Sequence, residues 1–389
     1  MISTYISEIY KKIVRWDKKL EIYTNGADNA YPERMERLRN NSVTATMASN
    51  TMVQYLIGKG FGEADNKVIG KSKLIDLADD IAHDIVDNRG VFIHVNYNAN
   101  FEISDWKVLP FGQCRIGEKD SKEYNGKILV YDDWCGKIDK NKVQVINIFN
   151  PDKKIVEYQI KKAKGIENYR GQVFYYNMDG QYYYPLARID PVNHDCNSEY
   201  NASIYKDNIL ENGFVQSTFF ITRPLVDDGF IEDPTDILAI KTRKKELSER
   251  ENFRKAGQKM LGAKGIGGFM HMEVDFKGED LSKAIEIKTV KSDVDPALFK
   301  FVEESATKKV LMVYNNLPVG LVVSDSSMFG DSGNSLRVMK ETYWENTSKE
   351  RNLLETIVND LLRYMDTENY TYVSILPLLT PKNEPDAIN

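Results

Sequence analysis

Residues 74–98, LIDLADDIAHDIVDNRGVFIHVNYN, change their hydrophobic period in mid-course. The first half repeats apolar residues at spacings of three and four, which predicts a helix with one buried face that ends near Gly90. Residues 91–97 then alternate, and Asn98 and Asn100 bound them, which predicts a strand followed by a turn. A helix that leads straight into a strand is the first indication of a fold that mixes both elements.

A second helix is expected on the N-terminal side of this stretch. Ser42 is a good N-cap, because its hydroxyl can accept a hydrogen bond from a free amide of the first turn, and Gly58 ends the run. The apolar residues at helical spacing, expected on one face, are Val43, Met47, Met52, Leu56 and Ile57. A short amphipathic helix is also expected over residues 7–15.

The middle third is rich in strand patterns. Strands are expected over residues 101–109, 127–131, 143–149 and 155–160, and an aromatic hairpin over 172–187, with strands 173–176 and 182–184 around Asp179-Gly180. This block lies between two helical thirds of the chain, and that order favours an α+β fold over a doubly wound sheet. In the last half we expect helices over 199–212, 237–261, 295–314 and 334–366, and strands over 214–222, 269–276 and 370–379.

The composition excludes several classes of protein. The chain has 389 residues, 42% hydrophobic and 28% charged, which is typical of a globular protein of two or three packed units. A net charge of −6 excludes a strongly basic nucleic-acid binder at the level of the whole chain, although it allows local basic faces. No apolar run is long enough to span a membrane, so no membrane partner is expected.

No catalytic residue, cofactor or metal ligand emerges from the motifs. The 3 cysteines are far apart and suit a reducing cytosol, and the 4 histidines show no close ligand spacing. Gly70-Lys71-Ser72 has the end of a phosphate-binding loop, but Asp65 stands where its leading glycine belongs. The glycines of residues 262–268 also miss that spacing. We therefore expect a protein that is not an enzyme.

The helix expected over residues 237–261 has a strong excess of basic side chains. Lys245–Glu249 and Glu251–Lys255 lie four apart and can support the helix. Such a face is most often simply solvated, and contact with a polyanion or with an acidic neighbouring surface is the alternative. The candidate basic face consists of Lys241, Lys244, Lys245 and Arg254.

Residues 315–333 form a long loop between two expected helices, and loops of this length within a compact fold are usually functional or disordered. Their apolar part should pack against other residues. The candidate DNA-facing residues of this loop are Asn315, Asn316, Ser324, Ser326, Ser327, Gly330 and Ser332.

The order of these pieces resembles the portal proteins of tailed bacteriophages. The phrases that carry the resemblance are Tyr31-Pro32, the IGKGF of residues 57–61, the GVFIHV of 90–95, the helix that ends in Asn212-Gly213, the NNLPVGL of 315–321 and the FGDSGN of 329–334. No single phrase is specific, and the ordered combination over most of the chain makes the resemblance.

The resemblance implies a portal fold with a β-rich wing, a helical stem, a short clip, long tunnel and wing helices, and a minimal or absent crown. The implied domains are 1–191 wing, 192–213 stem helix, 214–236 clip, 237–261 second stem helix, 262–290 wing strands, 291–314 tunnel helix, 315–333 tunnel loop, and 334–389 long wing helix with a C-terminal strand and tail.

The resemblance also implies a function and partners. The chain would form a ring, most often a dodecamer, at one capsid vertex, and would conduct double-stranded DNA without sequence specificity during packaging and ejection. The implied protein partners are the major capsid protein, the terminase motor and tail adaptor or head-completion proteins. The implied location is the virion, and the host cytoplasm during assembly.

Two other functions remain open from the residues alone. A metal-dependent nucleic-acid hydrolase could use the carboxylate pairs Asp132-Asp133 or Asp227-Asp228, although both pairs lie in turn-like sequence. A different virion structural or binding module could use the aromatic residues 175–184 as a contact face. Alternating tyrosines are more often a half-buried sheet face.

Overall fold

The computed structural model describes residues 16–17, 20–180, 182–212, 217–222, 237–260, 268–273, 285–289, 296–322, 333–366 and 368–378. The chain divides into two compact units: unit 1 consists of Met1–Asn197 and Ser305–Asn389, and unit 2 of Ser198–Glu304. Along the chain, α6 (Asn193–Asn212) leads out of unit 1 and α8 (Pro296–Val313) leads back into it. The predicted helix over 7–15 lies outside the described residues.

Unit 1 is a mixed α+β structure, as predicted. Its sheet has 8 strands in the order β1-β2-β7-β8-β9-β10-β5-β6. Neighbouring strands are antiparallel except β9 and β10, which are parallel. The strands are β1 (Trp16–Asp17), β2 (Ile22–Tyr23), β5 (Gly90–Tyr97), β6 (Ile103–Leu109), β7 (Cys114–Gly117), β8 (Lys127–Val130), β9 (Gln144–Ile148) and β10 (Gln172–Asn177).

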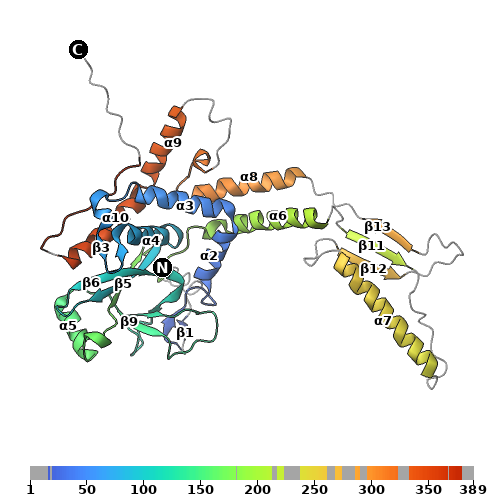
Figure 1. The fold of residues 1–389 in the computed structure, drawn as a ribbon, viewed down its shortest axis with the longest axis horizontal. Coiled ribbons are helices and arrows are strands. Elements are labelled where there is room, and N and C mark those ends of the chain that lie inside the picture. The colour runs from blue at the N-terminus through green and yellow to red at the C-terminus, as the bar shows by residue number, and fades with distance from the viewer. Residues whose placement is uncertain are drawn as a thin grey trace, which may run out of the picture. The chain divides into compact units, whose positions relative to one another are not determined.

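Helices cover one face of this sheet. Figure 1 shows α3, α4 and α10 together beside β5 and β6. Strand β5 explains the layering: Val91, Ile93 and Val95 join the core under the helices, whereas Phe92 points into a second cluster on the opposite face. The helices of unit 1 are α2 (Tyr31–Asn41), α3 (Val43–Ile57), α4 (Leu74–Asp87), α5 (Lys153–Lys162), α9 (Gly333–Asn346) and α10 (Ser348–Met365), with parts of α6 and α8.

The predicted helix ends at the start of the chain are confirmed. The Ser42 hydroxyl accepts a hydrogen bond from the Ala45 amide at 3.1 Å, and Gly58 ends α3 with a φ of +58°. The expected apolar face of α3 was wrong in its first turns, because Val43 and Met47 are 72% and 45% exposed. The small residues of this helix, such as Ala45, are buried in their place and let α3 approach its neighbours closely.

The strand predicted over residues 155–160 was wrong. This segment is helix α5, whose N-cap Asp152 accepts a hydrogen bond from the Lys154 amide at 2.9 Å. Val156 and Ile160, four residues apart, are its buried pair. The window is short enough that its apolar residues fit either period, and the cap residue is the signal that distinguishes them.

The aromatic hairpin predicted over residues 172–187 was also wrong. Its first half is β10, but β10 pairs with β5 and β9 and not with residues 182–184, which form no strand. Tyr184 is instead buried against β2 and β7: its hydroxyl donates to the Tyr23 carbonyl and accepts from the Ile116 amide, both at 2.7 Å. Long-range partners thus override a plausible local turn.

Two predictions near the C-terminus need correction. The helix expected over 334–366 is two helices, α9 and α10, separated at Thr347, whose buried hydroxyl donates to the Tyr343 carbonyl at 3.0 Å. The strand expected over 370–379 is absent from residues 370–378. Asn359 holds that segment instead, since its side chain accepts from the Val373 amide at 2.9 Å and donates to the Val373 carbonyl at 2.8 Å.

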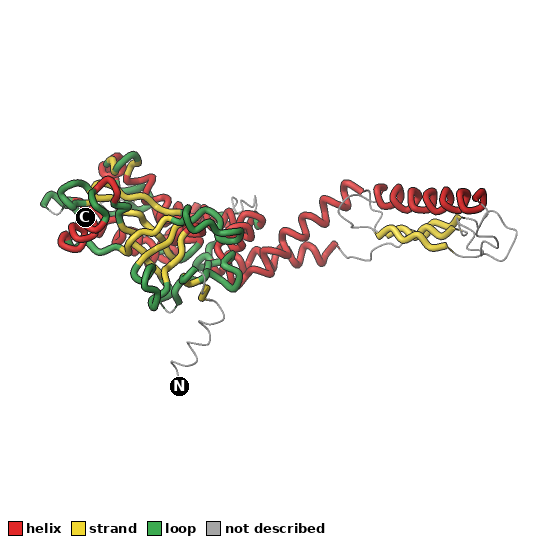
Figure 2. The backbone as a smooth tube through the Cα atoms, turned by 90° about the horizontal axis from the view of Figure 1, so that it is seen from below, coloured by secondary structure: helices red, strands yellow, loops and turns green. Residues whose placement is uncertain are grey.

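The described residues of unit 2 form a long helix, a small sheet and parts of α6 and α8. The sheet has the order β12 (Gly268–Glu273), β11 (Ser217–Thr222), β13 (Ile285–Thr289), with β11 parallel to β12 and antiparallel to β13. Helix α7 (Ile237–Met260) runs alongside these strands (Figure 2). The described parts of the strands expected within 262–290, β12 and β13, both pair with β11.

Candidate functional site

The candidate basic face lies on α7, as the sequence predicts. Lys241, Lys244 and Lys245 are exposed, and Arg254 lies in the helix, although its side chain is outside the described part. The helix has eight basic and three acidic residues. Its pairs Lys245–Glu249 and Lys255–Glu251, at 3.9 Å and 2.9 Å, are exposed, and water and salt screen them, so they contribute little to stability.

A partly buried ion pair fixes α7 to the small sheet. Arg250 Nε lies 2.6 Å from Glu273 Oε1 of β12, and both side chains are largely covered. The helix therefore has a sheet-facing side and a solvent-facing side. The exposed lysines belong to the second, so α7 presents net positive charge to whatever lies outside unit 2.

The start of the loop 315–333 is well ordered. Asn315 and Asn316 both have positive φ, 56° and 53°, and the Asn316 and Leu317 amides close the end of α8 on the Met312 and Leu311 carbonyls. Leu317 is buried, so the predicted packing of the apolar part is confirmed there, whereas Val319 is 42% exposed. The candidates Ser324, Ser326, Ser327, Gly330 and Ser332 lie outside the described residues.

Asn315 belongs to a buried polar cluster that we call the Arg188 hub (Arg188, Asn315 and Glu350). The Arg188 guanidinium lies 3.0 Å from Glu350 Oε1 and 2.9 Å from Asn315 Oδ1, and donates to the carbonyls of Val86 and Val313 at 2.9 Å and 3.2 Å. Asn315 Nδ2 donates to Glu350 Oε1 at 3.0 Å. The hub thus joins the ends of α4 and α8 to the start of α10.

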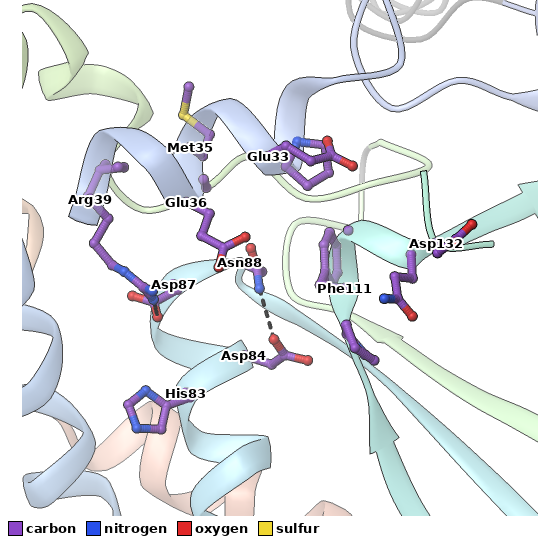
Figure 3. A pocket seen from close by; sticks show the side chains of 16 residues that line it. Glu33, Met35, Glu36, Arg39, His83, Asp84, Asp87, Asn88, Phe111 and Asp132 are labelled. Carbon is purple, nitrogen blue, oxygen red and sulfur yellow. Dashed lines mark hydrogen bonds and ion pairs between the residues drawn. The ribbon is translucent and has the colours of Figure 1, made fainter. Parts of the chain in front are cut away.

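A second feature, the acidic cleft, is a cavity of about 530 Å³ in unit 1. Side chains from α2, from the end of α4 and from the turn Phe111–Gln113 line it (Figure 3). Its acidic residues are Glu33, Glu36, Asp84, Asp87 and Asp132. They come from three segments that are far apart in the sequence, and no spacing between these segments indicated a common site.

The two aspartates at the end of α4 differ in their partners. Asp87 forms an ion pair with Arg39 and accepts from the Ser49 hydroxyl at 2.6 Å. Asp84 Oδ1 accepts from Asn88 Nδ2 at 2.8 Å, whereas Asp84 Oδ2 is buried and has no hydrogen-bond partner among the described residues. Burial raises the pKa of the Asp84 carboxyl well above its usual range.

The other motifs of the sequence have structural roles. Gly70 and Lys71 form the turn between β3 (Val68–Ile69) and β4 (Ser72–Lys73). Asp133 Oδ1 accepts from the amides of Cys135 and Gly136 at 2.9 Å and 3.0 Å, which is turn chemistry.

In the part of the chain that the structure describes, no cluster of three or more His, Cys, Asp or Glu could hold a metal ion. In that same part, no helix is both long and apolar enough to cross a membrane.

Comparison with known proteins finds similarity only among solved structures. No family model and no curated protein matches the chain. The neck of a native gene transfer agent particle, computed with C12 symmetry, has a TM-score of 0.45 and 10% identity, over 95% of this chain and 87% of that chain. The virion of a native gene transfer agent particle has a TM-score of 0.45 and 11% identity, over 90% and 83%.

A phage structure is among the matches as well. The HK97-family phage portal protein from Corynebacterium diphtheriae has a TM-score of 0.40 and 10% identity, over 90% of this chain and 95% of that chain.

Proposed function

We propose that this chain is the subunit of a phage portal, a ring at one capsid vertex through which double-stranded DNA passes during packaging and ejection. The observation that carries the proposal is the division of the chain: Ser198–Glu304 forms a compact unit of its own, inserted in sequence between two parts of unit 1. The resemblance in sequence assigns the stem helices and the clip to residues 192–261, most of which lie in this unit, and assigns wing strands and the start of the tunnel helix to the rest of it. The insertion therefore falls where channel elements are expected.

The charge of α7 supports the same function. DNA must slide through a portal, and every fixed phosphate contact adds a salt-dependent binding term that resists sliding. In this proposal Lys241, Lys244 and Lys245, together with Arg254, face passing phosphates or an acidic surface of the neighbouring subunit. Exposed, loosely paired lysines on one helix suit weak and non-specific contact better than a deep basic groove would.

The remaining parts of the proposal follow from the resemblance. The ring would be a dodecamer in the virion, assembled in the host cytoplasm, and would contact the major capsid protein, the terminase and tail adaptor or head-completion proteins. The loop 315–333 would lie toward the channel, and Asn315, tied into the Arg188 hub, would hold its base. The protein itself would catalyse no reaction.

Electron microscopy of the purified full chain tests the ring. We expect negatively stained particles with a central hole. Monomers alone across micromolar concentrations, together with no ring in assembled particles, would contradict the proposal.

A packaging assay tests the role of α7. The test variant carries Lys241→Gln, Lys244→Gln and Lys245→Gln together. We expect it to package less DNA or to form less stable rings, and the salt dependence of that packaging or ring stability should differ from the wild type. The matched control replaces three exposed lysines of unit 1, Lys137, Lys140 and Lys142, by Gln and should behave like the wild type. If the α7 variant packages DNA normally at every salt concentration, the helix is only a solvated face.

A further inference from the structure

Unit 1 contains two Asn-Gly steps, at residues 25–26 and 125–126, and a further step at 212–213 extends past the described residues. In such a step the backbone nitrogen of the glycine can attack the side-chain amide of the asparagine, because glycine has no side chain to shield that nitrogen. The two steps of unit 1 share this chemistry but differ in their surroundings. The fold therefore decides which of them can react.

The step at residues 125–126 lies in an exposed turn. Asn125 and Gly126, both exposed, are the central residues of the turn that leads into β8. The Lys127 amide donates to the Tyr124 carbonyl at 3.1 Å, and the φ of Gly126 is +69°, which favours glycine at this position.

Nothing in the described structure holds the two reacting groups of this turn. The Asn125 side chain and the Gly126 amide form no hydrogen bond with any described residue. A Cβ built on Gly126 would meet no atom within 4 Å, so the space beside its backbone is open. The Asn125 side chain and water can therefore both approach the Gly126 nitrogen.

The step at residues 25–26 is closed by contrast. Asn25 is 1% exposed, and a Cβ built on Gly26 would lie 2.6 Å from the Cβ of Tyr31. The Asn25 amide donates to Asn29 Oδ1 at 2.9 Å, and the Asn25 carbonyl accepts from the Tyr31 amide at 3.2 Å. Rotating this backbone so that the side chain reaches the Gly26 nitrogen would break the second bond. Asn25 is therefore an internal reference for a blocked step.

We propose that Asn125 is a site of spontaneous deamidation in the folded protein. The Gly126 nitrogen forms a bond to Asn125 Cγ, and the bond from Cγ to Nδ2 breaks. Nδ2 leaves as ammonia with the proton of the Gly126 amide, and a cyclic succinimide remains. Water then opens this ring at Cγ to give aspartate, or at the backbone carbonyl carbon to give isoaspartate. The sum consumes one water and releases one ammonia, with no oxidant or reductant.

The product changes the charge and the backbone just before β8. A new carboxylate joins the exposed Glu123 in this turn. In the isoaspartyl form the backbone runs through the side-chain carbons of residue 125 and gains one atom. The Gly126 carbonyl accepts from the Ile148 amide at 3.0 Å, so this extra atom lies where the pairing of β8 with β9 begins.

The test incubates the purified full chain at mildly alkaline pH and follows its proteolytic peptides by mass spectrometry. In the folded chain Asn125 should convert at least about tenfold faster than Asn25, because a closed step reacts only in its locally opened fraction. The rate at Asn125 should rise with pH, since the deprotonated Gly126 amide is the better nucleophile. In urea the two rates should become similar, because the fold no longer distinguishes the steps.

The matched variant is Asn125→Gln, which keeps Gly126 and a side-chain amide but requires a larger and slower ring closure. Its peptide should show no conversion over the time in which the wild type reacts. The proposal is overturned if Asn125 in the folded wild type converts no faster than Asn25, or if the Asn125→Gln peptide converts as fast as the wild type. Neither result depends on whether the protein forms a ring.

Discussion

Replacing Arg188 by Met should destabilise unit 1 strongly. The side chain is 8% exposed and its guanidinium serves four acceptors, among them the Glu350 carboxylate, which is 7% exposed. Met fills most of the volume but leaves that carboxylate buried, with Asn315 as its remaining partner in the hub. Breaking a buried pair by removing one partner costs roughly 3–5 kcal/mol, and we expect a loss of that size.

Urea denaturation followed by tryptophan fluorescence measures this loss in the right unit. All 4 tryptophans, Trp16, Trp106, Trp134 and Trp344, belong to unit 1, so unit 2 contributes no tryptophan signal. The matched control is Arg337→Met, because Arg337 pairs with Glu341 on the exposed side of α9. Its effect should stay within about 0.5 kcal/mol of zero.

A double-mutant cycle shows whether the loss comes from the uncompensated charge. Arg188→Met combined with Glu350→Leu removes both charges, and the double variant should be more stable than Arg188→Met alone. Two results would refute the reasoning: a loss below about 1 kcal/mol for Arg188→Met, or a double variant whose loss equals the sum of the two single losses.

Three further changes have defined outcomes. Ser42→Ala should cost about 1 kcal/mol in the same urea assay, because the first turn of α3 loses its cap, and an unchanged midpoint would show that the hydroxyl is dispensable. Gly58→Ala should cost more than about 1 kcal/mol, since φ is +58° and the new Cβ would lie 2.3 Å from the Leu376 carbonyl oxygen; wild-type stability would mean that this loop shifts freely. Asp84→Asn should stabilise the protein at neutral pH. Burial raises the pKa of the Asp84 carboxyl in the folded state above its value in the unfolded state, so the stability of the wild type falls as the pH rises from the unfolded-state pKa through the folded-state pKa. That gain should vanish in acid below both pKa values, and a gain independent of pH would contradict the assignment.

Several helix ends and hydrophobic periods of unit 1 could be predicted from the sequence, because they depend on residues that are close together in the chain. Ser42 and Gly58 bound α3 because capping depends on residues within one turn of the helix end. The change of period at residues 74–98 likewise predicted α4 and β5, since an amphipathic face repeats along the segment itself. The basic face of α7 could be predicted as well, because the charge of a side chain follows from its residue type and does not depend on the fold.

Errors arose where a segment's partner lies far away in the chain. Residues 172–177 form a strand as expected, but the tyrosines after them do not pair with it, because β5 and β9 occupy both of its edges. Residues 370–378 look like a strand and are instead held by Asn359. Which edge is free, and which side chain can replace a backbone partner, depends on the packing of the whole unit.

The helix caps, the periods of α4 and β5 and the charge of α7 could be predicted from the residues alone, because each depends on neighbours within a few positions. The Arg188 hub and the acidic cleft could not, because they form when distant segments pack together. Arg188 and Glu350 are 162 residues apart, and the acidic residues of the cleft come from three separate segments. A lone arginine or aspartate has no pattern along the chain, and its role follows from which charges burial brings within a few ångströms of it.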